Sequence, residues 1–128
     1  MFHNISEDTF AFMLFNNFIS HATIIDNINE ISEIKRDVFC SYIYQINDLD
    51  ILTKLFNKKC IPEFIIYDIL DKQKINYLNL IVNNYDPLEI NKYFNYSIQN
   101  DLIDNVKILL PVEEIKYNVF MIESLLFE

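Results

Sequence analysis

The 128-residue sequence contains no glycine, although an ordinary domain carries about 7% of it. Glycine supplies the left-handed backbone of tight β-hairpins and of phosphate-binding loops. Its absence therefore disfavours a β-sandwich, a Rossmann nucleotide site and a P-loop. Asparagine is abundant, and it is the residue expected to adopt the left-handed conformation at helix ends instead. This composition favours helices over strands.

Side chains that could bind a metal or act as a nucleophile are also scarce. The two histidines, His3 and His21, have no cysteine or carboxylate at metal-ligand spacing. The two cysteines, Cys40 and Cys60, have no histidine in the same segment to act as a base, so no nucleophilic site is expected. Cys40 lies beside an apolar stripe and is predicted to be a core or boundary residue. Cys60 follows Lys58 and a second lysine, which are expected to lower its pKa.

Two pairs of neighbouring carboxylates, Glu113 with Glu114 and Asp48 with Asp50, have the composition of acid–base dyads. Both pairs fall at expected helix starts, where acidic side chains complement the helix dipole. We predict that the protein is not an enzyme and that it uses no cofactor and no metal. A polar pocket with perturbed acids and bases would contradict this prediction.

Positive charge and long apolar runs are in short supply. The formal net charge is −9, from 19 acidic and 10 basic residues, so the chain repels nucleic acid and anionic membranes. Its densest lysines, interspersed with carboxylates, are expected to form a solvated rim; they are Lys54, Lys58, Lys59, Lys72 and Lys74. No apolar run approaches the ~18 residues of a membrane span, and the N-terminus does not resemble a signal peptide. We expect an intracellular, cytoplasmic protein that binds neither nucleic acid nor membrane.

The prolines occur at positions 62, 87 and 111, so their spacings are 25 and 24 residues. Proline is favoured at the first position of a helix, and the regular spacing predicts that each proline opens the first helix of a helical hairpin. Polar turns divide the hairpins. The residues that follow these turns, Leu49, Ile75 and Leu102, are 26 and 27 residues apart, and a weaker fourth copy lies at 24–27.

Helical patterns extend over the rest of the chain. Ser6 or Asp8 is a candidate cap for the first helix, and isoleucines at helical spacing indicate another in 21–31. The segment 37–46 carries one apolar stripe, made of Val38, Phe39, Tyr42, Ile43 and Ile46.

These patterns predict an all-α fold of stacked helical hairpins in a single domain. It is a solenoid of about three to four short repeats plus terminal helices. The N-terminal helices occupy 1–31, the repeats about 32–110, and a C-terminal helix 111–128. An irregular helical bundle is the alternative.

The stretch 96–110 reads Tyr-Ser-Ile-Gln-Asn-Asp-Leu-Ile-Asp-Asn-Val-Lys-Ile-Leu-Leu, and 44–56 and 71–82 follow it more weakly. A polar turn followed by a second helix that ends in Leu-Leu resembles the degenerate ankyrin repeats of large DNA viruses. The units here lack the Thr-Pro-Leu-His start, and they are too short for β-hairpin fingers, which would be trimmed to turns. The resemblance implies protein–protein binding without catalysis, by a viral protein that acts on a host factor in the host cytoplasm.

Aromatic side chains are the candidates for a binding surface, because tyrosine is enriched in binding hot spots. Tyr44 and Tyr96 lie off the apolar stripes of their helices, and Tyr85 falls in a turn between units. Their alternative role is packing between neighbouring units. Leu126 and Phe127 are further candidates, because the chain ends without a polar capping repeat.

We therefore expect a non-enzymatic protein–protein interaction module. Two alternatives stay open. One is a self-associating structural helical protein, such as a homodimer formed through the terminal helices. The other is a small Bcl-2-like viral modulator, for which size, acidity and helix content are the arguments.

Overall fold

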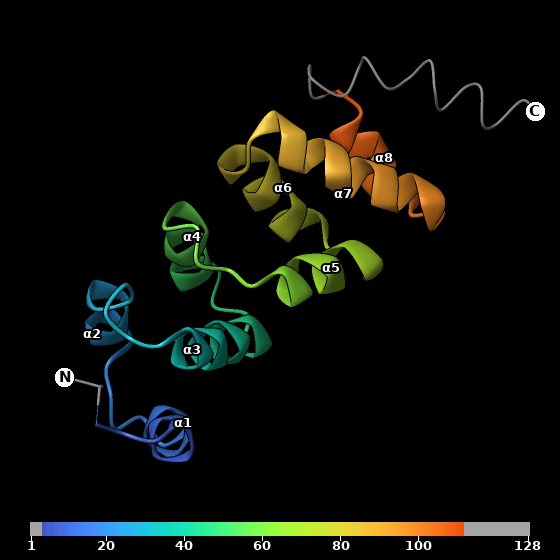
Figure 1. Cartoon of the computed structure of the whole chain (residues 1–128). Coiled ribbons are helices and arrows are strands. Elements are labelled where there is room, and N and C mark those ends of the chain that lie inside the picture. Colours follow the sequence, from blue (N-terminus) through green and yellow to red (C-terminus); the bar gives the residue numbers. More distant parts are fainter. Residues whose placement is uncertain (1–3, 112–128) are drawn as a thin grey trace, which may run out of the picture. The chain divides into compact units, whose positions relative to one another are not determined.

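The computed structural model describes residues 4–111, which form eight α-helices and no strand (Figure 1). The all-α prediction is confirmed for these residues. The C-terminal helix predicted for 111–128, with Leu126 and Phe127, lies outside them apart from Pro111. The helices are α1 Glu7–Phe15, α2 His21–Asp26, α3 Glu33–Gln45, α4 Leu49–Asn57, α5 Glu63–Asp71, α6 Ile75–Asn84, α7 Pro87–Gln99 and α8 Ile103–Leu109.

Side-chain caps explain why most of these helices begin where they do. The hydroxyls of Ser6, Ser20 and Ser32 each accept a hydrogen bond from the main-chain N–H three residues later. The carboxylates of Asp48 and Asp86 do the same at the starts of α4 and α7. Such a cap stabilises a helix by about 1 kcal/mol. Of the two candidate caps for the first helix, Ser6 is confirmed, whereas α6 and α8 begin without a side-chain cap.

Left-handed residues close five helix ends in the described part of the chain, and none of them is glycine. They are Asn17, Asn47, Lys59, Gln73 and Asp101, with φ between 50° and 61°. After each one, the next N–H donates to the carbonyl five residues back, which is the outer hydrogen bond of a Schellman motif. Asparagine takes two of these positions, as predicted. Lysine and glutamine take two others, at a cost of about 1–2 kcal/mol each for a residue with a Cβ.

The polar turns also fall where the sequence periodicity places them. Leu49 and Ile75 are the first residues of α4 and α6, and Leu102 is the N-cap of α8. The suggested fourth copy at 24–27 is displaced, because these residues end α2, which begins at His21.

The three prolines do not play equivalent parts. Pro87 opens α7, as predicted. Pro62 lies one residue before α5, and Pro111 follows the end of α8. The helix that Pro111 was expected to open lies outside the described residues.

The chain divides into two compact units, Met1–Ile65 and Ile66–Glu128. In the first, α1 packs against α3, α2 against α4, and α3 against α4. With α1–α2 and α3–α4 taken as hairpins, the first helix of one hairpin thus contacts the first helix of the other, and the second helix contacts the second helix. The core is aromatic and aliphatic, with no exposed surface on Phe10, Leu14, Ile24, Phe39, Cys40, Ile43, Leu52, Leu55 and Phe56.

In the second unit, α8 packs against α6 and α7. The Tyr67 ring of α5 contacts the rings of Tyr93 and Tyr96 of α7, with centroids 5.9 and 4.8 Å away. With α5–α6 and α7–α8 taken as hairpins, the two first helices again contact each other, and so do the two second helices. The fully buried apolar side chains are Ile66, Ile69, Leu70, Leu78, Ile81, Phe94 and Leu109.

Candidate functional site

Helix α3 carries apolar side chains on two faces. One face is buried and holds Phe39, Cys40 and Ile43. Ile34, Val38 and Tyr42 are four residues apart, so they form a row along a second face. Ile34 is exposed and the other two are half-buried. A helix that only covered a core would have a polar outer face, so this second row marks a surface available for contact.

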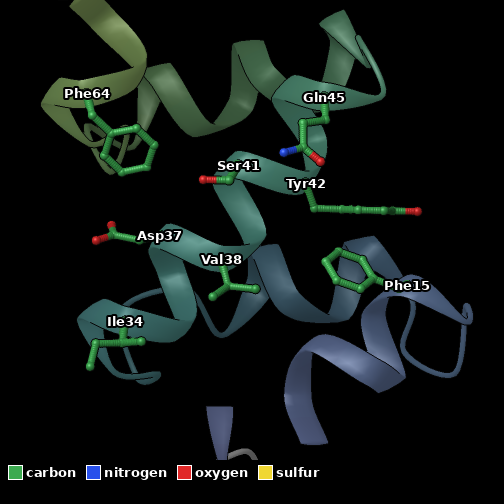
Figure 2. Close-up of a pocket in the computed structure, with 8 residues that line it drawn as sticks. All are labelled: Phe15, Ile34, Asp37, Val38, Ser41, Tyr42, Gln45 and Phe64. Carbon is green, nitrogen blue, oxygen red and sulfur yellow. The ribbon is translucent and has the colours of Figure 1, made fainter. Parts of the chain in front are cut away.

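Two phenylalanines flank this row. Phe15, the last residue of α1, is 54% exposed, and Phe64, the second residue of α5, is 57% exposed. The Phe15 ring packs against the Tyr42 ring with centroids 5.3 Å apart. Figure 2 shows the α3 side chains lying between the two phenylalanines. Together they form an open groove of about 390 Å³, the α3 groove, lined by Phe15, Ile34, Asp37, Val38, Ser41, Tyr42, Gln45 and Phe64.

More exposed aromatic surface lies beside Phe15 in the sequence. Phe12 and Phe18 are both exposed, and their rings stack with centroids 6.1 Å apart. Contiguous exposed apolar surface on a folded domain commonly marks an interaction site. The first unit therefore presents exposed phenylalanines from α1, from the segment after it and from the start of α5.

Asp37 is the one charged residue that lines the α3 groove. Partial burial raises the pKa of this carboxyl, and the negative charge of Glu33 one turn earlier adds to the effect. Arg36 acts in the opposite direction without cancelling the shift. A cation supplied by a binding partner would stabilise the Asp37 carboxylate.

The tyrosines predicted from the sequence lie elsewhere. Tyr96 is half-buried, and its hydroxyl donates a hydrogen bond to the Asp71 carboxylate, which raises the pKa of Tyr96. Tyr85 is half-buried against the ring of Tyr93 at 5.9 Å. Both belong to the second unit, whereas Tyr44 is a half-buried residue of α3. None of the three lines the α3 groove, and their role in partner binding stays a prediction, as does that of Leu126 and Phe127.

Sequence reasoning missed the groove because it treated the stripe in 37–46 as one buried face. In the structure Phe39 and Ile43 are buried, Val38 and Tyr42 are half-buried, and Ile46 is exposed. The width of the stripe was the available signal, since neighbouring apolar residues at i and i+1 cannot all face one core.

The two cysteines behave differently from each other. Cys40 is fully buried, as predicted, and Cys60 is half-buried. The pKa of Cys60 is lowered, as expected, but the largest cause is the neighbouring Cys40 thiol. Arg36, and then Lys58, contribute less.

The described residues contain no group of three or more His, Cys, Asp or Glu side chains arranged to hold a metal ion. Within the same range, 4–111, no helix is long and apolar enough to cross a membrane. His21 lies edge-on to the rings of Phe39 and Tyr42, with centroids 5.9 and 5.7 Å away.

Comparison with known proteins found no matching family model, curated protein or solved structure. The α3 groove is therefore the main indication of function in this chain.

Proposed function

We propose that the protein is a non-enzymatic protein-interaction module that binds an amphipathic helical segment of a partner in the α3 groove. One observation carries the proposal: exposed phenylalanines stand on both sides of an apolar row along one helix. Helix-in-groove recognition depends on this kind of surface, in which apolar anchors at helical spacing enter an apolar channel.

The dimensions of the groove support a short helix as its occupant. The α3 residues that line the groove extend from Ile34 to Gln45, which is 11 residue steps or about 16 Å along the axis of α3. A partner helix of about three turns would match this length and present apolar side chains at i, i+3 or i+4, and i+7. Phe15 and Phe64 would contact those side chains, and large desolvated aromatic contacts provide much of the affinity at such interfaces.

The charge of the groove supports a basic partner. Asp37 lines the α3 groove, and burial together with the nearby Glu33 raises its pKa. A lysine or arginine on the partner helix would offset both influences, because its positive charge stabilises the carboxylate. The net charge of −9 adds a favourable long-range field for a basic segment. The same net charge opposes the approach of a second copy of this chain.

The interaction role also fits the packing of the helices, which we propose is that of stacked helical hairpins within each unit. The left-handed turn residues Asn17, Asn47, Gln73 and Asp101 recur at intervals of 30, 26 and 28 residues. In both units first helices contact first helices and second helices contact second helices. Stacked repeats present a row of first helices as a binding face. Kinship with viral ankyrin-like repeats, with a host protein as the partner inside the cell, belongs to this proposal.

Fluorescence anisotropy with a labelled model peptide tests the groove. The probe is a three-turn amphipathic helix with leucines at i, i+4 and i+7 and lysines beside them, compared with a scrambled peptide of equal composition. We expect Phe15→Ser and Phe64→Ser each to weaken binding by roughly tenfold or more. Leu88→Ser, an equivalent change at a 79% exposed site on α7, is the control and leaves binding unchanged. Equal affinity for both peptides, or indifference to Phe64→Ser, contradicts the proposal.

Self-association is decided by a separate measurement. Light scattering over a range of protein concentrations reports the mass of the full chain. We expect a mass that does not change with concentration. A mass that rises with concentration, and returns to the monomer value in Phe64→Ser, would assign the groove to a second copy and overturn the choice of a basic partner.

A further inference from the structure

We propose that Cys40 and Cys60 form a peroxide-responsive thiol pair that closes to a disulfide joining α3 to the segment between α4 and α5. The proposal concerns a modification site outside the α3 groove, with which it shares Asp37 as a lining residue, and it stands whether or not that groove binds a partner. It begins from the placement of two cysteines that are 20 residues apart in the sequence.

The Cys40 thiol lies against Cys60 in the first unit. Cys40 Sγ donates to the main-chain oxygen of Cys60 at 3.4 Å, and Cys60 Sγ donates to the main-chain oxygen of Leu55 at 3.4 Å. Each thiol is also the largest single influence on the pKa of the other, lowering that of Cys60 and raising that of Cys40. Both cysteines are free. A disulfide needs two cysteines that lie side by side, and the contact of Cys40 Sγ with the main-chain oxygen of Cys60 places the two residues next to each other.

The two positions differ in access and in charge. Cys60 is half-buried and lines an open polar depression of about 480 Å³ together with Arg36 and Lys58, whereas Cys40 is fully buried behind it. The neighbouring Cys40 thiol, Arg36 and Lys58 lower the pKa of Cys60, and the Cys60 thiol together with burial raises that of Cys40. Three carboxylates, Glu33, Asp37 and Glu63, line the same depression, and the influence that opposes the lowering of the Cys60 pKa is burial.

This difference assigns a role to each sulfur. Reactive cysteines are partly exposed and lie near cations, where the thiolate is favoured. Cys60 therefore meets the oxidant first, and Cys40 is the resolving thiol that waits beside it, as in many redox-sensitive pairs. Cys40 is too deeply buried to react with a peroxide directly.

The oxidant is a hydroperoxide, and the chemistry balances in two steps. The Cys60 thiolate attacks one peroxide oxygen, so that an S–O bond forms, the O–O bond breaks, and the leaving oxygen takes up a proton as water or an alcohol. Cys60 is then a sulfenic acid. The Cys40 sulfur attacks the Cys60 sulfur, the S–O bond breaks, and the departing hydroxide takes the Cys40 proton as water. Two thiols and one peroxide yield one disulfide, one water and one water or alcohol.

Peptide mapping by mass spectrometry after treatment of the full chain with hydrogen peroxide tests the proposal. In the wild type we expect a peptide pair joined through Cys40 and Cys60, lighter by two hydrogens and released by a reductant. In Cys40→Ser the disulfide cannot form, and a dimedone adduct should accumulate at Cys60. In Cys60→Ser, Cys40 should stay unmodified. The proposal would be overturned if Cys60 of the wild type were oxidised to sulfinic acid and no disulfide with Cys40 formed.

Alkylation rates separate activation of Cys60 from general exposure. Cys40→Ser keeps a hydrogen-bond donor beside Cys60, and Cys40→Ala removes it, so Cys60 should react with iodoacetamide several-fold more slowly in Cys40→Ala than in Cys40→Ser at neutral pH. Arg36→Gln should also slow the alkylation of Cys60, because it removes a nearby positive charge. Lys107→Gln, the same charge change in the second unit, should leave the rate unchanged. Equal rates in all four variants would contradict the pairing, and circular dichroism confirms that each variant is folded.

Discussion

Asn105 donates a hydrogen bond from its side-chain Nδ2 to the main-chain oxygen of Leu70 at 2.7 Å, and both residues are fully buried. This bond joins α8 to the end of α5 within the second unit. The same amide nitrogen lies 3.4 Å from Ser97 Oγ, which itself donates to the Tyr93 carbonyl in α7. Three helices thus meet at one buried polar side chain, whose Oδ1 atom has no hydrogen-bond partner.

Replacing Asn105 by alanine is expected to destabilise the protein by about 1 kcal/mol. The substitution removes one of the two hydrogen bonds that the buried Leu70 carbonyl accepts, the other coming from the Gln73 N–H, and a buried hydrogen bond contributes about this much. Urea denaturation followed by circular dichroism measures the change. Asn95→Ala, at an exposed position of α7, is the matched control and should stay within about 0.5 kcal/mol of the wild type. Equal stability of the two variants would remove Asn105 from its structural role.

Lys59→Gly is expected to stabilise the first unit. Lys59 has φ of 57°, a left-handed conformation that costs a residue with a Cβ about 1–2 kcal/mol and costs glycine nothing. Glycine also gains entropy in the unfolded chain, so a net gain of about 0.5–1 kcal/mol is expected. Thermal denaturation should show a higher Tm.

Lys54→Gly supplies the opposite control for this effect. Lys54 is exposed within α4, where glycine costs about 1 kcal/mol. A Lys59→Gly variant that loses as much stability as Lys54→Gly would contradict the proposed left-handed turn.

Local features of this fold were predictable from the sequence, because capping and turn chemistry act over a few residues. Ser6, Ser32 and Asp86 cap helices through bonds to N–H groups three residues away. Leu49 and Ile75 follow turns whose asparagine or polar residues adopt the left-handed conformation. A pattern of this kind needs no knowledge of the tertiary structure.

Long-range relationships were not predictable in the same way. Asp71, the partner of Tyr96, is 25 residues away, and the carbonyl that receives the Asn105 bond is 35 residues away. The α3 groove depends on Phe15 and Phe64 flanking one face of a helix that is apolar on two faces. Periodicity identifies apolar residues, but it does not say which of two apolar faces stays uncovered. The binding role of Tyr44 or Tyr85 stays a prediction for the same reason.

The hydrogen bond from Tyr96 to Asp71 predicts a pH dependence in the alkaline range. Its donation to a carboxylate raises the pKa of Tyr96 above the ordinary value of 10.0. A raised pKa means that the folded state holds the phenol proton more tightly. The stability from this bond is therefore complete below pH 10.0 and is lost as the pH rises through the pKa of the folded protein.

An NMR titration of ¹³C-labelled tyrosine, with Tyr96 assigned from Tyr96→Phe, measures the effect. In Asp71→Asn the titration midpoint of Tyr96 should fall, because the negative charge that holds the proton is removed. Asp101→Asn, an equivalent change at an exposed turn, should leave the midpoint in place. Coincident midpoints in the wild type and Asp71→Asn would show that the bond does not persist in solution.

The charge in the α3 groove predicts how partner binding responds to salt and pH. Asp37→Asn should weaken binding of the lysine-containing model peptide by up to about fivefold, the range expected for an ion pair that water partly screens. Added salt should weaken wild-type binding and have less effect on the variant. Because burial and Glu33 raise the pKa of Asp37 above the ordinary value of 3.8, acid should remove the wild-type advantage at a pH higher than an unperturbed aspartate would require. Asp104→Asn, in the second unit, should reproduce none of these changes. Binding that is equally strong with glutamates in place of the lysines would mean that apolar contact alone selects the occupant, and that the basic character proposed for the partner is wrong.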